Sequence, residues 1–130
     1  MKKYVAVIFI VGLFSSCCKW EIGACTEYKG YHKFIYEPIV ISEDCNCIVA
    51  GKVKYLKDCK TVALIHYGDG ECDNVATKII CENGDCYGKD NEPLESYEFT
   101  IKCNGNTISE GIVEADELEL LFDLNAGPQP

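Results

Sequence analysis

Cysteine content is the feature that most constrains the fold of this chain. Ten of its 130 residues are cysteine, at positions 17, 18, 25, 45, 47, 59, 72, 81, 86 and 103. In a reducing compartment such a set indicates metal binding, whereas in an oxidising compartment it indicates disulfides. The compartment therefore decides what these thiols do, and the N-terminal residues carry that information.

The N-terminus has the layout of a secretory signal. Lys2 and Lys3 form a positive segment, and residues 4–14 form an apolar run that only Gly12 interrupts. This run is too short for a helix that crosses a bilayer, which needs about 20 residues, but it fits the apolar core of a signal peptide. We therefore expect an exported chain whose cysteines are oxidised.

The segment Phe14-Ser15-Ser16-Cys17 follows the apolar run directly. It resembles the lipobox of bacterial type II signal peptides, although that family prefers Leu where Phe14 stands. The resemblance implies cleavage after Ser16, a diacylglyceryl group on the Cys17 sulfur and an acyl chain such as palmitate on its amino group. Several such chains hold a protein on a membrane far more firmly than one does. The alternatives are an ordinary cleaved signal and a short buried helix.

These signals divide the chain into four parts. We expect a signal peptide at 1–16, a lipidated N-terminus and tether at 17–30, a β domain at 31–124 and a disordered tail at 125–130. The N-terminus is also similar to those of small lipoproteins of the Bacteroidetes, in which lysine and acidic residues after the cysteine direct export to the outer face. Lys19 and Glu21 are a short version of that signal. The resemblance implies an outer-membrane location and leaves the face open.

Acidic side chains dominate the charge. The full chain has a net charge of −9, and loss of Lys2 and Lys3 with the signal peptide takes it to −11. Such a surface repels phosphate backbones and anionic headgroups. We therefore expect no nucleic acid partner, and contact with the membrane only through the lipid on Cys17.

The hydrophobic pattern has a period of two. Residues 97–103 alternate between apolar and polar side chains, as in a half-buried strand. Asn104-Gly105 then favours a hairpin turn, with 107–113 as the returning strand. Further strands are predicted at 33–41, 48–55, 61–67 and 76–81, and Pro38 places the first of these towards a sheet edge.

Residues 115–124 fit a helix and a strand equally well, because either periodicity gathers the leucines on one face. The predicted fold class is therefore all-β: a small antiparallel β-sandwich or β-sheet domain with disulfides, and one short C-terminal helix as the alternative for this last segment.

Assigning Cys17 to lipid leaves an odd number of cysteines. Cys18, beside the lipid, is the expected odd one out. The disulfide candidates are then Cys25, Cys45, Cys47, Cys59, Cys72, Cys81, Cys86 and Cys103.

Geometry argues for one pairing. Asn83-Gly84 predicts a two-residue turn, which makes Cys81 and Cys86 a non-hydrogen-bonded pair with Cα atoms about 4.5 Å apart, and a disulfide spans such a gap.

The sequence gives weaker evidence for the partners of the other cysteines. Cys45 and Cys47 point to one side of a strand and are expected to bond elsewhere. Cys59 lies in a predicted turn that favours glycine. A cysteine at such a position suggests a disulfide, so we expect a bridge to Cys45, Cys47 or Cys72. Zinc is the competing interpretation, but paired CxxC knuckles are missing and only His32 and His66 are available as further ligands.

The loop Tyr67-Gly-Asp-Gly-Glu-Cys-Asp-Asn74 is the most distinctive segment. Its Tyr-Gly-Asp-Gly core resembles a structural motif of polycystic-kidney-disease-type β-sandwich repeats. The wider segment, residues 47–74, resembles a stretch of Bacteroidetes lipoproteins to which no activity is attached. Asp69, Glu71, Asp73 and Asn74 offer the oxygen ligands that calcium prefers. The alternative is a turn that Asp and Asn side chains cap.

No catalytic motif stands out. His66 is close in sequence to Asp69 and Asp73, but no nucleophile elbow or HExxH motif accompanies it. Trp20, Tyr28, Tyr31 and Tyr36 form either an aromatic platform for a sugar or protein, or part of the core. We therefore expect a noncatalytic binding or accessory module with a protein or glycan ligand. A small envelope hydrolase and an extracellular protease inhibitor are the alternatives.

Overall fold

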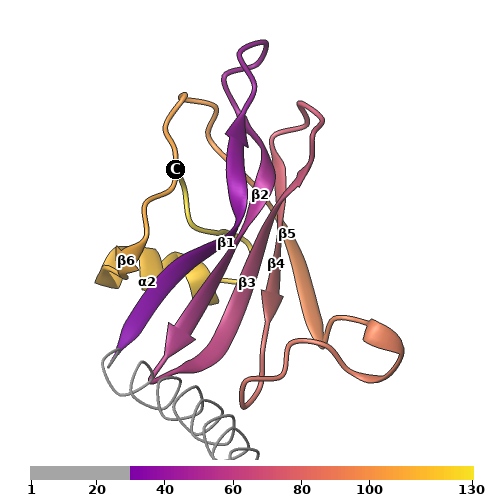
Figure 1. The fold of residues 1–130 in the computed structure, drawn as a ribbon, viewed down its shortest axis with the longest axis vertical. Coiled ribbons are helices and arrows are strands. Elements are labelled where there is room, and N and C mark those ends of the chain that lie inside the picture. The colour runs from indigo at the N-terminus through magenta and orange to yellow at the C-terminus, as the bar shows by residue number, and fades with distance from the viewer. Residues whose placement is uncertain (1–29) are drawn as a thin grey trace, which may run out of the picture.

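A computed structural model describes residues 30–130 of the chain (Figure 1). These residues form an antiparallel six-stranded sheet with the strand order β5-β4-β3-β2-β1-β6. The strands are β1 (Tyr31–Ile41), β2 (Ile48–Lys57), β3 (Lys60–Asp69), β4 (Val75–Ile80), β5 (Glu95–Thr100) and β6 (Gly111–Ile112). A short 3-10 helix, η1 (Lys89–Asn91), follows β4, and helix α2 (Ala115–Phe122) follows β6. The predicted antiparallel β fold is confirmed.

Strand alternation assigns the two faces of the sheet. Val53 and Tyr55 of β2 pair with Ile65 and Ala63 of β3, and all four side chains are buried in the core. The side chains between them point to the opposite face, because successive residues of a strand alternate. The sheet therefore has one apolar face and one more polar face.

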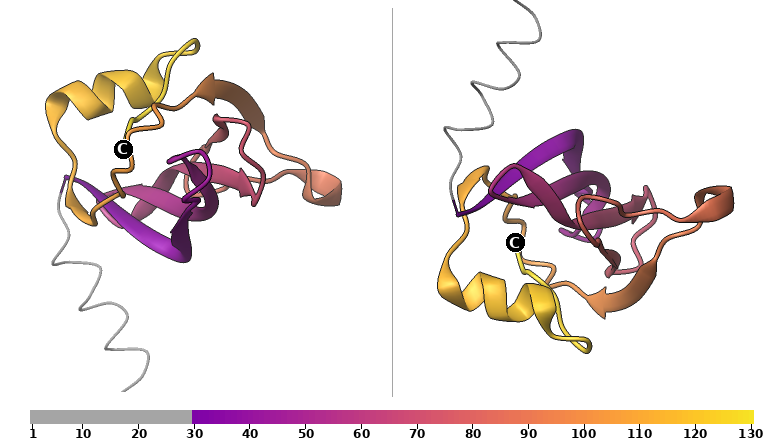
Figure 2. Two further views of the ribbon diagram at one scale, coloured as in Figure 1. Left: turned by 90° about the horizontal axis from the view of Figure 1, so that it is seen from above. Right: turned by 90° about the horizontal axis from the view of Figure 1, so that it is seen from below.

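Helix α2 and the C-terminal residues cover the apolar face (Figure 2). Leu121 of α2 is fully buried in the core cluster, together with Phe99 of β5 and Val113 beside β6. Of the two predicted architectures, the domain is thus a single sheet backed by one helix. Residues 115–124, which fit either element by pattern, form the helix.

The expected β5 hairpin through Asn104-Gly105 is wrong. The chain leaves β5 after Thr100, crosses the covered face and returns at the opposite edge, where Gly111 pairs with Lys33 of β1. Burial of Ile101 and Ile108 in the core holds this crossing. Gly105 does have a positive φ of 76°, but its N–H donates to the carbonyl of Asn46 in a different loop.

Pro38 lies where β1 is exposed at the edge of the sheet. The neighbouring strand β6 pairs only with His32 and Lys33, so nothing in residues 30–130 pairs with the outer side of β1 at Pro38. The pairing of β1 with β2 also shifts in register between Glu37 and Val40. Proline has no N–H to donate, and the fold tolerates it at this open position.

The C-terminal residues 125–130, expected to form a disordered tail, instead pack against the sheet. Gly127 is buried against the ring of Phe99, and a Cβ atom on Gly127 would clash with that ring. Gln129 accepts a hydrogen bond from the N–H of Lys102 at 2.8 Å and donates one to the carbonyl of Thr100 at 3.0 Å. The side-chain amide of Gln129 thereby takes the place of a backbone peptide group of a neighbouring strand at the end of β5.

Several predicted features lie outside the described residues. They are Cys17 and the signal peptide, Cys18, Cys25, Trp20 and Tyr28. Within residues 30–130, no helix has the length and apolar character needed to cross a bilayer.

Candidate functional site

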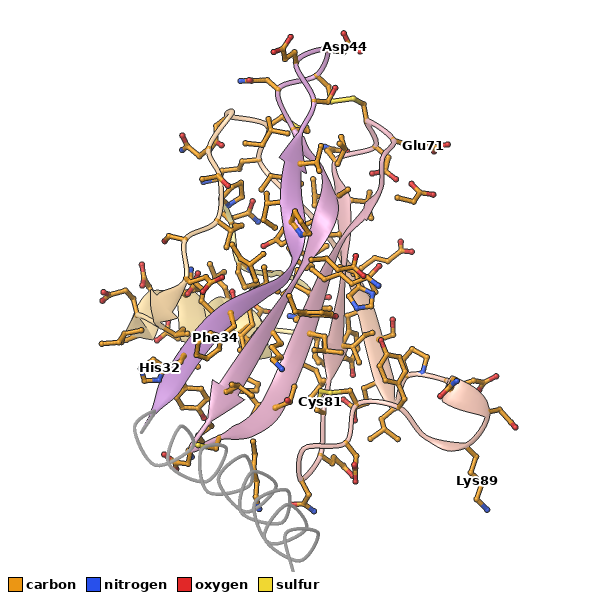
Figure 3. The ribbon with its side chains drawn as sticks, in the orientation of Figure 1. His32, Phe34, Asp44, Glu71, Cys81 and Lys89 are labelled. Carbon is orange, nitrogen blue, oxygen red and sulfur yellow. A yellow bond between two sulfur atoms is a disulfide. The ribbon has the colours of Figure 1, made fainter. Side chains whose placement is uncertain are left out.

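Two disulfides join loops at one end of the sheet. Cys45 bonds to Cys72 and Cys47 bonds to Cys103, with Cα separations of 6.1 and 4.2 Å. They connect the β1–β2 loop, the β3–β4 loop and the segment after β5, and Figure 3 labels Asp44 and Glu71 on the first two. Cys45 and Cys47 thus bond to other segments, as expected. This end lies away from Gly30, where the described chain begins (Figure 1).

The third disulfide closes the hairpin that follows β4. Cys81 and Cys86 are bonded, with Cα atoms 4.1 Å apart. Between them, Glu82 and Asp85 exchange backbone hydrogen bonds of 2.9 and 2.8 Å. This is the geometry predicted from the Asn83-Gly84 turn.

The expected bridge from Cys59 to Cys45, Cys47 or Cys72 is wrong, because those three cysteines are bonded as described above. Asp58 and Cys59 do occupy the tight β2–β3 turn, with φ angles of 48° and 72°. The turn lies beside Gly30, whose N–H donates to the Asp58 carboxylate at 2.9 Å.

The acidic side chains of the β3–β4 loop do not converge on one point. No group of three or more His, Cys, Asp or Glu side chains suited to a metal ion occurs within residues 30–130, so the structure does not bring Asp69, Glu71, Asp73 and Asn74 together as calcium ligands. Instead, the Asp73 carboxylate accepts a hydrogen bond from the N–H of Val75 at 3.2 Å. The carbonyl of Asn74 accepts one from Ile101. The loop is held by its own caps and by the Cys72 disulfide.

A groove lies on the more polar face of the sheet, opposite α2. Its volume is about 500 Å³, within the range of small-molecule sites. The lining comes from four successive segments: Tyr36 of β1, Lys52 and Lys54 of β2, Thr61 and Leu64 of β3, and Gly84, Asp85, Cys86 and Tyr87 of the hairpin after β4. The groove therefore runs across the strands.

Its floor is a small apolar cluster separate from the main core. Leu64 and Ile79 are buried there against the Cys81–Cys86 disulfide. The disulfide fixes the hairpin over this cluster, and Tyr87 follows the bridge directly. The fixed hairpin thus forms one wall of the groove.

Tyr36 and His66 form a hydrogen-bonded pair next to the groove. The Tyr36 hydroxyl lies 3.0 Å from His66 Nε2. Burial raises the pKa of Tyr36 to about 12, and the neighbouring Tyr87 and Glu37 add to this. Burial also lowers the pKa of His66, as does Lys52, while Glu37 opposes the shift. At neutral pH this is a pair of uncharged hydrogen-bonding groups.

The two lysines of the groove differ in their partners. Lys52 forms an ion pair with Glu37, with Nζ and Oε1 3.2 Å apart. Lys54 has Phe34 and Leu64 as its cross-strand neighbours and makes no ion pair with any residue in the 30–130 range. Lys54 thus supplies an uncompensated positive charge beside apolar surface.

The structure does not pair His66 with the acids that are close to it in sequence. The hydrogen-bond partner of His66 is Tyr36, rather than Asp69 or Asp73. The cysteine that lines the groove, Cys86, is bonded to Cys81. The groove thus combines two tyrosines, two lysines and an aspartate with an apolar floor.

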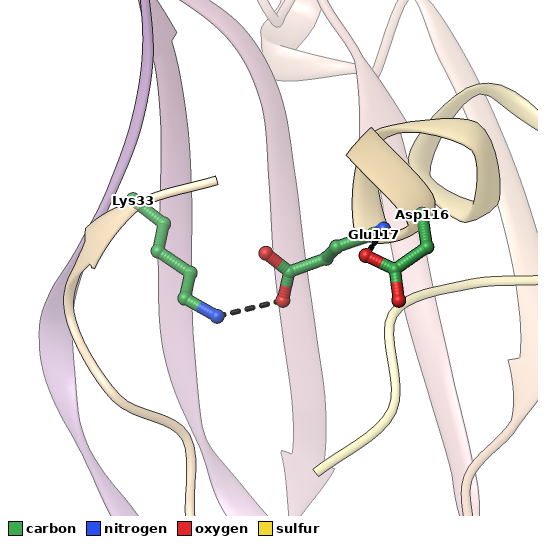
Figure 4. A network of polar contacts seen from close by, with 3 residues as sticks. All are labelled: Lys33, Asp116 and Glu117. Atoms are coloured by element: carbon green, nitrogen blue, oxygen red, sulfur yellow. Dashed lines mark hydrogen bonds and ion pairs between the residues drawn. The ribbon is translucent and has the colours of Figure 1, made fainter. Parts of the chain in front are cut away.

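A second hollow, of about 400 Å³, lies between α2 and the sheet edge. Its lining includes Lys33 of β1 and Glu117 of α2, whose Nζ and Oε1 atoms are 2.6 Å apart (Figure 4). The N–H of Glu117 also donates to the carboxylate of Asp116 at 2.9 Å. The Lys33–Glu117 ion pair joins β1 to α2 across this hollow, and Glu114 and Asp116 add two further acids to its lining.

The aromatic platform expected from sequence does not include Tyr31. Tyr31 packs on the covered face, with its ring 6.3 Å from that of Phe122 in α2. Tyr36 faces the other way and meets Tyr87 instead. The alternation of β2 indicates that Lys52 and Lys54 share a face, but no local signal in the sequence places Tyr87 opposite them.

Comparisons of the chain with protein-family models, with curated proteins and with solved structures find no match.

Proposed function

We propose that this chain is a noncatalytic binding module of the cell envelope, anchored by lipid on Cys17, that takes a small ligand in the groove between Tyr36 and Tyr87. The lipobox-like segment supports the anchor, and the groove supports the binding role. The observation that carries the binding role is the pairing of two partly exposed tyrosine rings, each 41% exposed, across a buried apolar floor. Exposed aromatic rings over such a floor are typical of recognition surfaces.

The proposed anchor implies an orientation for this module. The chain enters the sheet at Gly30, which lies against the β2–β3 turn through its bond to Asp58. A lipid on Cys17 would therefore place that turn nearer the membrane and the disulfide-joined loops farther from it. The groove opens sideways on the face of the sheet, where a ligand in the surrounding space has access.

The anchor is tested by replacing Cys17. Cys17→Ser should give an unprocessed precursor that takes up no labelled palmitate, while the β domain still folds with its three disulfides. Scrambled disulfides in Cys17→Ser would show instead that Cys17 is a disulfide partner and that the lipid assignment is wrong.

The groove is tested with the processed protein in detergent micelles against a panel of oligosaccharides, amino acids and short peptides. We expect at least one compound to raise the melting temperature, Tyr87→Ala to abolish that rise, and Tyr97→Ala on β5 to keep it. Binding that survives Tyr87→Ala, or a panel without a binder, contradicts the proposal.

The same protein should not turn over peptide, glycoside or ester substrates. Turnover that is lost in His66→Ala would favour the hydrolase alternative.

One observation favours a second candidate, a protease inhibitor. Two disulfides join three loops at the end of the sheet away from Gly30, and rigid, cross-linked loops suit the inhibition of a protease. Inhibition of an extracellular protease by the intact protein, lost in Cys45→Ser with Cys72→Ser, would support that role.

A further inference from the structure

We infer that the ligand of this groove is an acidic saccharide, with a single carboxylate placed against Lys54 and its hydroxyl groups along the tyrosines. This inference rests on the proposed function, because it names the chemistry of the ligand that the groove takes.

The anionic part of the ligand follows from Lys54. Lys52 already has Glu37 as a partner, but Lys54 lies between Phe34 and Leu64 and has no acidic partner within the described part of the chain. An ammonium group without an ion-pair partner is free to form a charge-assisted hydrogen bond with a carboxylate that reaches it. Of the two lysines that line the groove, Lys54 is therefore the one that remains available to an anion.

The polyhydroxyl part follows from the wall of the groove. Tyr36, Tyr87 and Thr61 present hydroxyl groups, and His66 is hydrogen-bonded to the first of these. Hydroxyls both donate and accept hydrogen bonds, so they match the hydroxyls of a sugar. The tyrosine rings offer flat apolar surface to the C–H face of a sugar ring.

Asp85 limits the number of charges on the ligand. It lines the same groove, on the hairpin side. Its carboxylate accepts hydrogen bonds from sugar hydroxyls but repels a second anionic group. A singly charged uronate unit next to a neutral or weakly charged sugar therefore fits better than a densely phosphorylated or sulfated ligand.

The position of the groove argues against an extended acidic peptide. Peptides that add to a sheet do so at an open edge, by backbone pairing. The groove crosses β1, β2 and β3, and the last two of these are paired on both sides. Apart from Gly84, the lining residues present side chains, so recognition depends on rings, hydroxyls and charge.

The test is a calorimetric titration of the processed protein in detergent with galacturonosyl-galactose, a disaccharide with one carboxylate, with the neutral galactose disaccharide and with triglutamate. We expect galacturonosyl-galactose to bind at least about tenfold more tightly than the neutral disaccharide, and triglutamate not to bind. Lys54→Gln should remove this preference, and Lys54→Arg should keep most of it. Lys60→Gln, a change at an exposed lysine outside the groove, is the matched control.

The outcomes separate this inference from the function on which it rests. Equal affinity for both disaccharides, lost in Tyr87→Ala, would overturn the acidic ligand and leave the groove as a binding site. Absence of saccharide binding, or an unchanged preference in Lys54→Gln whose melting temperature equals that of the parent, would also overturn the inference. Binding of galacturonosyl-galactose that Tyr87→Ala leaves intact would overturn the proposed groove itself.

Discussion

The ammonium group of Lys78 in β4 donates a hydrogen bond of 2.5 Å to the carbonyl oxygen of Ala126 near the C-terminus. It also donates to the carbonyls of Leu120 and Asp123, at the end of α2. Lys78 is only 1% exposed. A positive charge there complements the negative end of the helix dipole and satisfies carbonyls that the helix leaves unpaired. One side chain thus fixes both α2 and the C-terminal residues on the sheet.

Replacing this lysine should therefore loosen the covered face. Lys78→Met keeps most of the buried volume but leaves the three carbonyls without their donor. We expect a loss of about 2–4 kcal/mol in the free energy of unfolding by urea. The exposed Lys89→Met, on η1, should change it by less than about 0.5 kcal/mol. Equal losses in the two variants would contradict the clamp.

The Lys33–Glu117 pair should contribute measurable coupling. It joins β1 to α2, and its side chains are 11% and 16% exposed. A double-mutant cycle with Lys33→Met and Glu117→Gln should give a coupling of about 1–3 kcal/mol. The more exposed Lys52–Glu37 pair serves as the control and should give less than about 1 kcal/mol. A reversed order would show that burial does not set the strength of these pairs.

His66 should make stability depend on pH. Burial lowers its pKa in the folded state below the ordinary value of 6.5, so the unfolded chain takes up a proton first as the pH falls. The free energy of unfolding should therefore drop as the pH falls below about 6.5. His66→Gln should show a smaller drop between pH 7.5 and pH 5 in urea titrations at each pH. An identical drop in both proteins would rule out His66 as a contributor.

The disulfides should differ in their effect on stability. The Cys47–Cys103 bridge spans 56 residues of sequence and the Cys81–Cys86 bridge spans 5. Because a longer loop restricts the unfolded chain more, removing the first with paired serines should cost about 2 kcal/mol more than removing the second. Unfolding of both double variants in urea measures the difference. A larger loss from the short loop would mean that its role in packing outweighs chain entropy.

The sequence predicts local features of this protein better than long-range ones. The turn at Asn83-Gly84 places Cys81 and Cys86 together because four intervening residues decide the geometry. The turn at Asn104-Gly105 predicts the wrong partner strand, because the Cys47–Cys103 bond and the buried Ile101 and Ile108 direct the chain across the sheet. Such contacts join residues far apart in sequence, and no local pattern reports them.

The same limit applies to the groove and to the C-terminal residues. Period-two alternation predicts that Lys52 and Lys54 share a face. It does not reveal that a hairpin brings Tyr87 to that face, or that Tyr31 and Tyr36 lie on opposite faces. The Gly-Pro-Gln-Pro end has the composition of a frayed tail, yet Gly127 fits against Phe99 where any side chain would clash.

The most direct test of the binding groove is a map of where a ligand touches the protein. The measurement is a two-dimensional NMR titration of the isotope-labelled, processed protein with the panel compound that raises its melting temperature most. We predict that the largest shifts occur at the backbone amides of Lys52, Lys54, Leu64 and Tyr87. Shifts confined to the disulfide-joined loops, residues 42–47 and 70–74, would contradict a binding site in the groove and favour the inhibitor alternative.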